Sequence, residues 1–171
     1  MEVAPFSYPC RRFDLYGAHK LIREELYAEI RRSMPIPCVD VLVWDGSFVL
    51  LLKRAKSPAE NSWWLPGGRV LHSESRQDAA RRKVREECGL EVSEVTEVAT
   101  FDVFLPHAEG YLSHGITTVF FANASSMRTP LLDEQSQESR WFPIDTVLSL
   151  ELHPFVRGVL DLYCTNEMDV T

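Results

Sequence analysis

Residues 67–90 read GGRVLHSESRQDAARRKVREECGL, and this stretch decides the fold. The glycine pair predicts a tight turn, because glycine tolerates backbone conformations that other residues avoid. Ala80, Val84 and Cys88 follow at steps of four, which is the spacing of one buried stripe on a helix. Gly89 comes directly after the last of them, where a left-handed residue can end the helix. The stretch therefore predicts a loop, a helix and a second loop.

The charged residues of this helix suggest a metal site. Lys83, Glu86 and Glu87 are predicted to lie on or near the surface opposite the apolar stripe, so that two carboxylates and an ammonium share one patch. Carboxylates beside a turn that exposes carbonyl oxygens suit a hard cation such as Mg²⁺, which keeps water ligands for a phosphate substrate. The alternative is a solvated helix face with ion pairs at four-residue spacing.

The spacing of eight residues resembles the Nudix box of the Nudix hydrolases. The box pattern is G-x5-E-x7-R-x-U-x-E-E-x-G-U, with U an aliphatic residue, and it is met by Gly68, Glu74, Arg82, Val84, Glu86, Glu87, Gly89 and Leu90. Eight fixed positions are far more specific than a lone glycine motif. The family usually has Glu directly after the box arginine, whereas this chain has Lys83. A cation there should repel a metal cluster and pair with Glu86 or Glu87, so we expect fewer metal ions.

Periodic patterns predict the elements outside this stretch. The predicted strands cover residues 38–44, 48–54, 95–104, 116–121 and 138–143. A helix is predicted over residues 18–32, a short helix from a cap at Asp145 through Leu150, and a last helix that starts at Pro154. Asp45-Gly46 predicts a two-residue hairpin turn, and residues 105–114 and 122–132 are predicted loops. This order agrees with a mixed β-sheet between helices. The resemblance implies an α/β protein with the Nudix-type α/β/α sandwich and a loop-helix-loop catalytic motif.

Composition bounds the organisation and the partners of the chain. Its 171 residues with 45% hydrophobic content fit one domain. The resemblance divides the chain into an N-terminal arm and amphipathic helix (1–34), a Nudix hydrolase domain (35–164) and a tail (165–171). The net charge of −7 argues against nucleic acid as a partner. No apolar run is long enough to cross a bilayer and no signal core is visible, so we expect a cytoplasmic protein without membrane contact. The four scattered cysteines indicate reduced thiols.

Residues 20–142 are similar to the GDP-mannose mannosyl hydrolase subfamily. The shared features are Pro35 before Asp40 on a strand, Lys53-Arg54 closing the next strand, Trp64-x-Pro66-Gly67-Gly68-Arg69-Val70 in the glycine turn, and Leu132-Asp133-Glu134-Gln135 before Arg140-Trp141. That subfamily also lacks the glutamate after the box arginine, and it cleaves the sugar C1–oxygen bond with one Mg²⁺. The resemblance implies metal ligands at the Gly67 carbonyl, Glu87 and Gln135, with Mn²⁺ as an alternative ion.

The same resemblance implies roles for other residues. Arg54 would bind the diphosphate, where a guanidinium offsets the charge of the leaving group. Arg69 and Asp40 would lie near the leaving group and the substrate, and His107 aligns with a histidine of the subfamily. From spacing alone, Asp40 lies either on a wet edge face or next to a ligand, and His107 is a loop histidine that either takes part in proton transfer or is structurally incidental.

Two departures from the subfamily leave the chemistry open. Ser136 stands where the subfamily has the histidine that serves as general base, and serine alone is too weakly basic for that task. Gly115 stands where the subfamily has a tyrosine near the leaving group. Either another group activates water, with Glu134, Glu86 and His107 as candidates, or the substrate and the chemistry differ.

Three functions follow from these observations. The leading hypothesis is a Mg²⁺-dependent Nudix hydrolase of a nucleoside diphosphate sugar or a related nucleoside diphosphate derivative. The second is ordinary cleavage of the diphosphate P–O bond, with Glu86 and Glu87 holding metal and Glu134 as a further candidate ligand. The third is a binding module that senses a nucleotide without turning it over. The resemblance also makes us expect a homodimer through the N-terminal segment.

Overall fold

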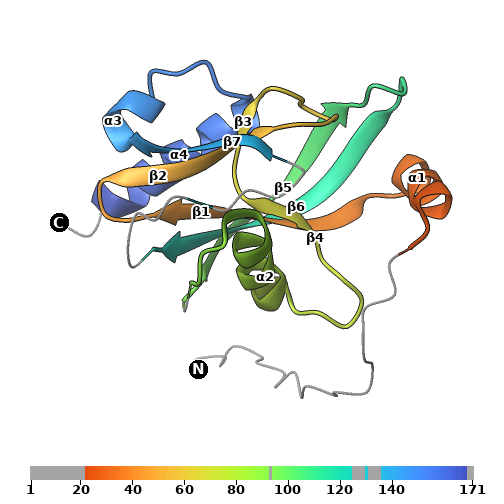
Figure 1. Ribbon diagram of the computed structural model, residues 1–171, viewed down its shortest axis with the longest axis horizontal. Helices are drawn as coiled ribbons and strands as arrows, with labels where there is room; N and C mark the ends of the chain where they lie inside the picture. The colour runs from red at the N-terminus through yellow and green to blue at the C-terminus, as the bar shows by residue number, and fades with distance from the viewer. Residues whose placement is uncertain (1–21, 93, 125–129, 131–135, 169–171) are drawn as a thin grey trace, which may run out of the picture.

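The computed structural model describes residues 22–92, 94–124, 130 and 136–168 (Figure 1). Its helices are α1 (Glu24–Ser33), α2 (Arg76–Cys88), α3 (Ile144–Val147) and α4 (Pro154–Met168). Its strands are β1 (Ile36–Trp44), β2 (Phe48–Arg54), β3 (Trp63–Trp64), β4 (Gly67–Arg69), β5 (Thr96–Pro106), β6 (Leu112–Asn123) and β7 (Ser136–Pro143). None of the described helices combines the length and the apolar character needed to span a bilayer.

The strands form one mixed sheet with β1 in the middle. β1 runs parallel to β6 from the Ile36–Gly115 pair to the Trp44–Asn123 pair, and β5 continues the sheet as the antiparallel neighbour of β6. β2 pairs antiparallel with both β3 and β7. The predicted mixed α/β sheet is therefore confirmed.

Helices cover both faces of this sheet, which confirms the expected α/β/α sandwich. On one face, α2 packs Ala80 and Val84 against Val41 and Phe120, all without solvent exposure. On the other face, Val156, Val159 and Leu160 of α4 pack against the opposite sides of the same strands. The alternation of side chains along each strand allows this, because successive residues point to opposite faces.

Helix α1 lies apart from these layers, at the end of the sheet beside β6 (Figure 1). It starts at Glu24, so the expected start at residue 18 is wrong for Ile22 and Arg23, which precede the helix; residues 18–21 lie outside the described part of the chain. None of the residues of α1 is buried, and Leu26 on its apolar stripe is 45% exposed. The homodimer expected through this segment stays a prediction.

The expected hairpin between β1 and β2 is only partly correct. Asp45 Oδ1 accepts hydrogen bonds from the amides of Ser47 and Phe48, so a turn is present, but the two strands share a single ladder pair, Trp44 with Val49. Beyond that pair the strands diverge, because β1 pairs with β4 and β6 while β2 pairs with β3 and β7. This divergence leaves room between them for a pocket.

Two other expectations are wrong in their bounds. The loop expected over residues 105–114 shortens to the turn 107–111, because β5 continues to Pro106 and β6 starts at Leu112, and the amide of His107 donates to the carbonyl of Tyr111. Asp145 lies inside α3 and makes no cap, since the helix follows Pro143 without a side-chain hydrogen bond. Most of the loop expected over 122–132 lies outside the described residues.

Helix α2 has the predicted caps and a broader buried face than predicted. Ser75 caps its start by accepting from the amide of Asp78, and Gly89 ends it in the left-handed region at φ 64°. Lys83 and Glu87, expected on or near the surface, are each only 6% exposed. That expectation was wrong because β4 covers the side of the helix next to the apolar stripe, where these two residues lie.

We expect Gly67→Ala to destabilise the protein strongly. A Cβ at residue 67 would lie 2.1 Å from Asp40 Oδ1 and 2.4 Å from the Val39 carbonyl oxygen, so β1 and β4 would have to separate. Overpacking of this kind costs about 1–3 kcal/mol or more. The matched control is Gly158→Ala in α4, where no atom lies within 4 Å of the added Cβ and a gain of about 0.5–1 kcal/mol is expected. Urea unfolding measures both, and equal stabilities would contradict this account.

Candidate functional site

A pocket of about 950 Å³ opens where β1 and β2 diverge. Residues from β1, β2, β4, α2, the β5–β6 pair and α1 line it. Its basic lining residues are Arg31, Arg54, Lys56, Arg69, Arg82 and Lys83, against the acidic Glu24, Asp40, Glu86 and Glu87. Lysine and arginine therefore outnumber the acids here, although the whole chain carries −7. This local excess of positive charge favours an anionic ligand.

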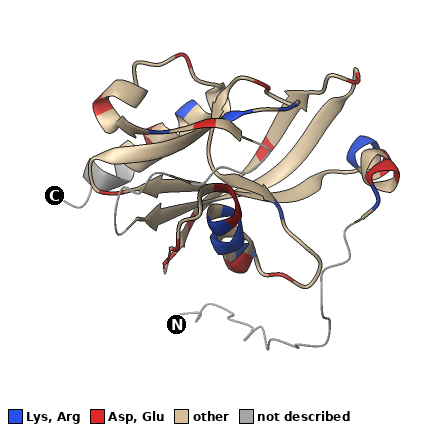
Figure 2. Ribbon diagram, viewed as in Figure 1, with Lys and Arg blue, Asp and Glu red and all other residues tan. Residues whose placement is uncertain are grey.

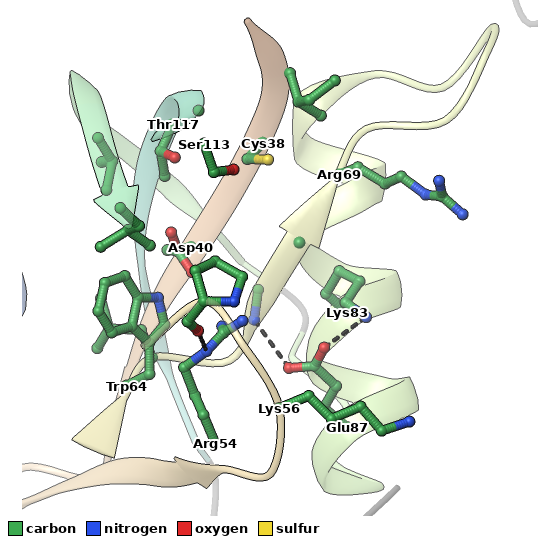
Figure 3. Close-up of a pocket in the computed structure, with 18 of the residues that line it drawn as sticks. Cys38, Asp40, Arg54, Lys56, Trp64, Arg69, Lys83, Glu87, Ser113 and Thr117 are labelled. Carbon is green, nitrogen blue, oxygen red and sulfur yellow. Dashed lines mark hydrogen bonds and ion pairs between the residues drawn. The ribbon is translucent and has the colours of Figure 1, made fainter. Parts of the chain in front are cut away.

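A buried ion pair between Lys83 and Glu87 lies on the α2 side of the pocket (Figure 3). Lys83 Nζ lies 2.5 Å from Glu87 Oε1, and both side chains are 8% exposed. The other oxygen of Glu87 accepts a hydrogen bond from the amide of Gly67 at 3.0 Å. Lys83 Nζ also lies 3.5 Å from Glu86 Oε2. The expected pairing of Lys83 with Glu86 or Glu87 is confirmed, and Lys83 contacts both of them.

Asp40 and Arg54 line the same pocket next to Trp64, and both are close enough to Glu87 for its charge to act on them (Figure 3). Burial raises the pKa of Asp40 well above its ordinary value, and the nearby positive charge of Arg54 acts against that rise. Burial likewise lowers the pKa of Arg54, opposed by Asp40. Arg54 Nε donates to the Pro58 carbonyl at 2.8 Å, which fixes the guanidinium over the Trp64 ring. Of the two alternatives for Asp40, the structure excludes the wet edge face.

Arg82 and Glu74 hold the loop before α2 in place. Arg82 Nε and Nη2 donate to the two carboxylate oxygens of Glu74 at 2.7 and 2.8 Å, and Arg82 also donates to the Arg69 carbonyl. Glu74 accepts in addition from the amide of Leu71. A bidentate pair of this kind is geometrically specific. These two box residues therefore position the loop, and Figure 2 shows how densely α2 carries both signs of charge.

The structure brings most of the predicted site residues together. Gly67, Gly68, Asp40, Arg54, Arg69, Arg82, Lys83, Glu86, Glu87, Gly115 and Ser136 all line the pocket. His107 does not line it: its ring stacks on Tyr111 in the β5–β6 turn. His114, which lines the pocket, instead contacts Asp102 at 2.9 Å. Gln135 and Glu134 lie outside the described residues.

Sequence reasoning did not identify the residues that α1 contributes. Glu24, Tyr27 and Arg31 line the pocket, and the Tyr27 ring lies 4.2 Å from the Arg69 guanidinium carbon. The amphipathic pattern of the helix predicted a buried stripe, and nothing in that pattern indicated which polar residues would face a ligand. Cys38 lies on β1 in the same pocket, and burial raises the pKa of its thiol to about 12.

The predicted metal ligands Gly67, Glu86 and Glu87 line the pocket. Within the described part of the chain, no group of three or more His, Cys, Asp and Glu side chains is placed to hold a metal ion. Both oxygens of Glu87 already contact donors, although a carboxylate oxygen has a second lone pair. A carboxylate in this arrangement fits an ion that takes its remaining ligands from substrate and water.

Comparison with known proteins gives the family. The chain matches the NUDIX domain model over residues 34–163. It is 29% identical to the low-salt glycan biosynthesis protein Agl8 of Haloferax volcanii over 82% of this chain and 89% of that protein. It is 29% identical to the 8-oxo-dGDP phosphatase NUDT18 of Danio rerio over 61% of this chain, but covers only 31% of that protein. A MutT NUDIX hydrolase from Burkholderia pseudomallei superposes with a TM-score of 0.65 at 27% identity, over 75% of this chain and 98% of that one.

Because the domain model spans most of the chain, this protein belongs to the Nudix family. It is a Nudix hydrolase, as the box pattern indicated. Enzymes of this family generally use divalent metal ions.

We expect the Lys83–Glu87 pair to behave as a unit in stability measurements. Lys83→Met or Glu87→Gln alone leaves one buried charge without its partner, which typically costs about 3–5 kcal/mol. The double variant removes both charges, so its loss should be much smaller than the sum of the two single losses. Urea unfolding of all four proteins without added metal measures the coupling. Additive losses would contradict the buried pair.

Proposed function

We propose that this protein is a Nudix hydrolase of a nucleoside diphosphate sugar or a related nucleoside diphosphate derivative, and that it acts with one bound Mg²⁺. The observation that carries this proposal is the buried Lys83 ammonium beside Glu87. Lys83 stands at the position where the common diphosphate-cleaving Nudix hydrolases have a further glutamate. Its positive charge would repel additional cations. Support for a nucleoside diphosphate comes from the relative named 8-oxo-dGDP phosphatase and from the excess of basic side chains in the pocket.

In this proposal the protein binds the diphosphate mainly from the β2 side. Arg54 is held by its Nε bond to Pro58, which leaves the outer edge of the guanidinium for phosphate oxygens. A fixed cation there offsets the charge that develops on the departing diphosphate. A magnesium ion at Glu87, with Gly67 and Gln135 as further proposed ligands, would supply charge neutralisation to the same group.

In this proposal, residues on the β1 side of the pocket would contact the sugar of the substrate. Asp40 is buried in a central strand, and its raised pKa suits a carboxyl that shares a proton with a substrate hydroxyl. Ser136 lines the pocket, and because serine alone is too weakly basic to activate water, Glu86 and Glu134 are the candidates for that task. His107 loses support as a base because it does not line the pocket.

Ordinary diphosphate cleavage is the second candidate function, and one observation favours it. Glu86 and Glu87 both lie beside the pocket, as metal-binding glutamates of the box would. Against it, Lys83 contacts both carboxylates, which lowers their capacity to gather several ions. The two candidates differ in the bond that breaks.

Product analysis in H₂¹⁸O distinguishes the two functions. With GDP-mannose and other nucleoside diphosphate sugars as substrates, we expect ¹⁸O in the released sugar and unlabelled nucleoside diphosphate, because water attacks the sugar carbon. Mass spectrometry of both products gives the answer. Label in a nucleoside monophosphate would instead establish P–O cleavage, and tight Mg²⁺-dependent binding with no turnover across the panel would favour a binding module.

The number of bound metal ions tests the role assigned to Lys83. We expect the natural chain to bind one Mn²⁺ in the presence of a nucleoside diphosphate, and Lys83→Glu to bind two or more, because a carboxylate replaces the repelling ammonium. Lys83→Met is the matched control, since it removes the charge without adding a ligand. Electron paramagnetic resonance titration counts the bound ions. The same count in Lys83→Glu and in the natural chain would be incompatible with this role.

A further inference from the structure

The pocket has a second basic end, built by α1 and β4. Tyr27 of α1 contacts two guanidinium groups: the Arg69 Cζ lies 4.2 Å from its ring centroid and the Arg31 Cζ lies 4.7 Å away. All three residues line the pocket. An aromatic ring attracts a guanidinium through its π face, so both cations lie beside the same ring.

The positive charge at this end is poorly balanced by the protein itself. Arg69 forms no ion pair with any residue in the described part of the chain. Arg31 pairs with Glu24 at 3.0 Å, but the Glu24 side chain is 75% exposed, so that pair is screened by water. Arg31 Nε and Arg69 Nη1 are both buried and donate to no acceptor among the described residues. An anion that entered this end of the pocket would supply acceptors for these two N–H groups.

This basic end is separate from the Glu87 side of the pocket. On β1, Asp40 pairs with Gly67 of β4, whereas Cys38 pairs with Arg69. Residues two apart on a strand lie on the same face about 7 Å from each other. The backbone of Arg69 therefore lies two residues along β4 from Gly67, which is a proposed metal ligand. A distance of this size is close to the width of a sugar ring.

We propose that Tyr27, Arg31 and Arg69 form an anion subsite, which binds a carboxylate or phosphate carried by the sugar of the substrate. The planar fork of a guanidinium matches both groups, and both arginines line the pocket. This inference rests on the proposed function for the diphosphate end. It adds that the preferred substrate class is a nucleoside diphosphate derivative whose sugar bears its own negative charge.

Binding of small sugar phosphates to the full chain tests the subsite without requiring turnover. The probes are glucose 1-phosphate, glucuronic acid 1-phosphate and glucose 1,6-bisphosphate, each titrated by calorimetry. We expect at least one of the two probes with a second anionic group to bind about tenfold more tightly than glucose 1-phosphate, since charge-assisted hydrogen bonds are the strong ones. Preference for glucuronic acid 1-phosphate identifies a carboxylate, and preference for the bisphosphate identifies a phosphate. Equal affinity for all three overturns the proposal.

Two arginines that follow each other on α1 give matched variants. Arg31→Met should remove most of the preference, whereas Arg32→Met should retain it, because Arg32 contacts Glu109 and Tyr111 and does not line the pocket. Tyr27→Phe keeps the ring and should retain the preference, whereas Tyr27→Leu should lose it. Thermal unfolding confirms that each variant is folded. If Arg32→Met lost as much of the probe preference as Arg31→Met, the preference would be a general effect of positive charge, and the proposed subsite would be overturned.

The proposed function and the subsite fail in different ways. Suppose that the chain turns over no nucleoside diphosphate derivative, but that it prefers a probe with a second anionic group and loses this preference in Arg31→Met. The proposed function then fails and the subsite stands. If turnover is found and the three probes bind equally, the function stands and the subsite is overturned.

Discussion

The buried ion pair between Lys83 and Glu87 is the interaction on which the site depends. The ammonium and the carboxylate are both buried and neutralise each other's charge. Either charge alone at this buried position would destabilise the folded protein. The second oxygen of Glu87 accepts from the Gly67 amide, so the same carboxylate ties α2 to β4. The pair therefore fixes the glycine turn against the helix, and it places a positive charge next to the carboxylate that is proposed to bind the metal ion.

The pocket itself exists because two consecutive strands separate. Beyond the Trp44–Val49 pair, β1 forms its ladder with β6 and β2 forms its ladder with β7. Both strands therefore keep backbone hydrogen bonds although they no longer pair with each other. Polar residues can then line the gap from both sides, with Asp40 on one strand and Arg54 on the other. Helix α1 closes the far end, although it contributes no buried residue to the core.

The sequence was most informative where a local rule decides the structure. Gly89 at a helix end, the Ala80/Val84 stripe and Pro154 at a helix start each follow from backbone sterics or from periodicity, and all three are confirmed. The burial of Lys83 and Glu87 depends on where β4 passes, and strand pairing between distant segments has no local signature. For the same reason Tyr27 could not be assigned to the pocket: it lies about forty residues from Arg69, the group it contacts. The box pattern indicated the family because it records a spacing that chemistry requires.

The cysteine inside the pocket has a consequence for reagents that act on thiols. Nucleophilic attack and oxidation proceed through the thiolate, and with a pKa of about 12 Cys38 carries almost no thiolate near neutral pH. Peroxide and alkylating compounds should therefore leave it unmodified even when they enter the cavity. A covalent inhibitor for this enzyme would have to target a different nucleophile.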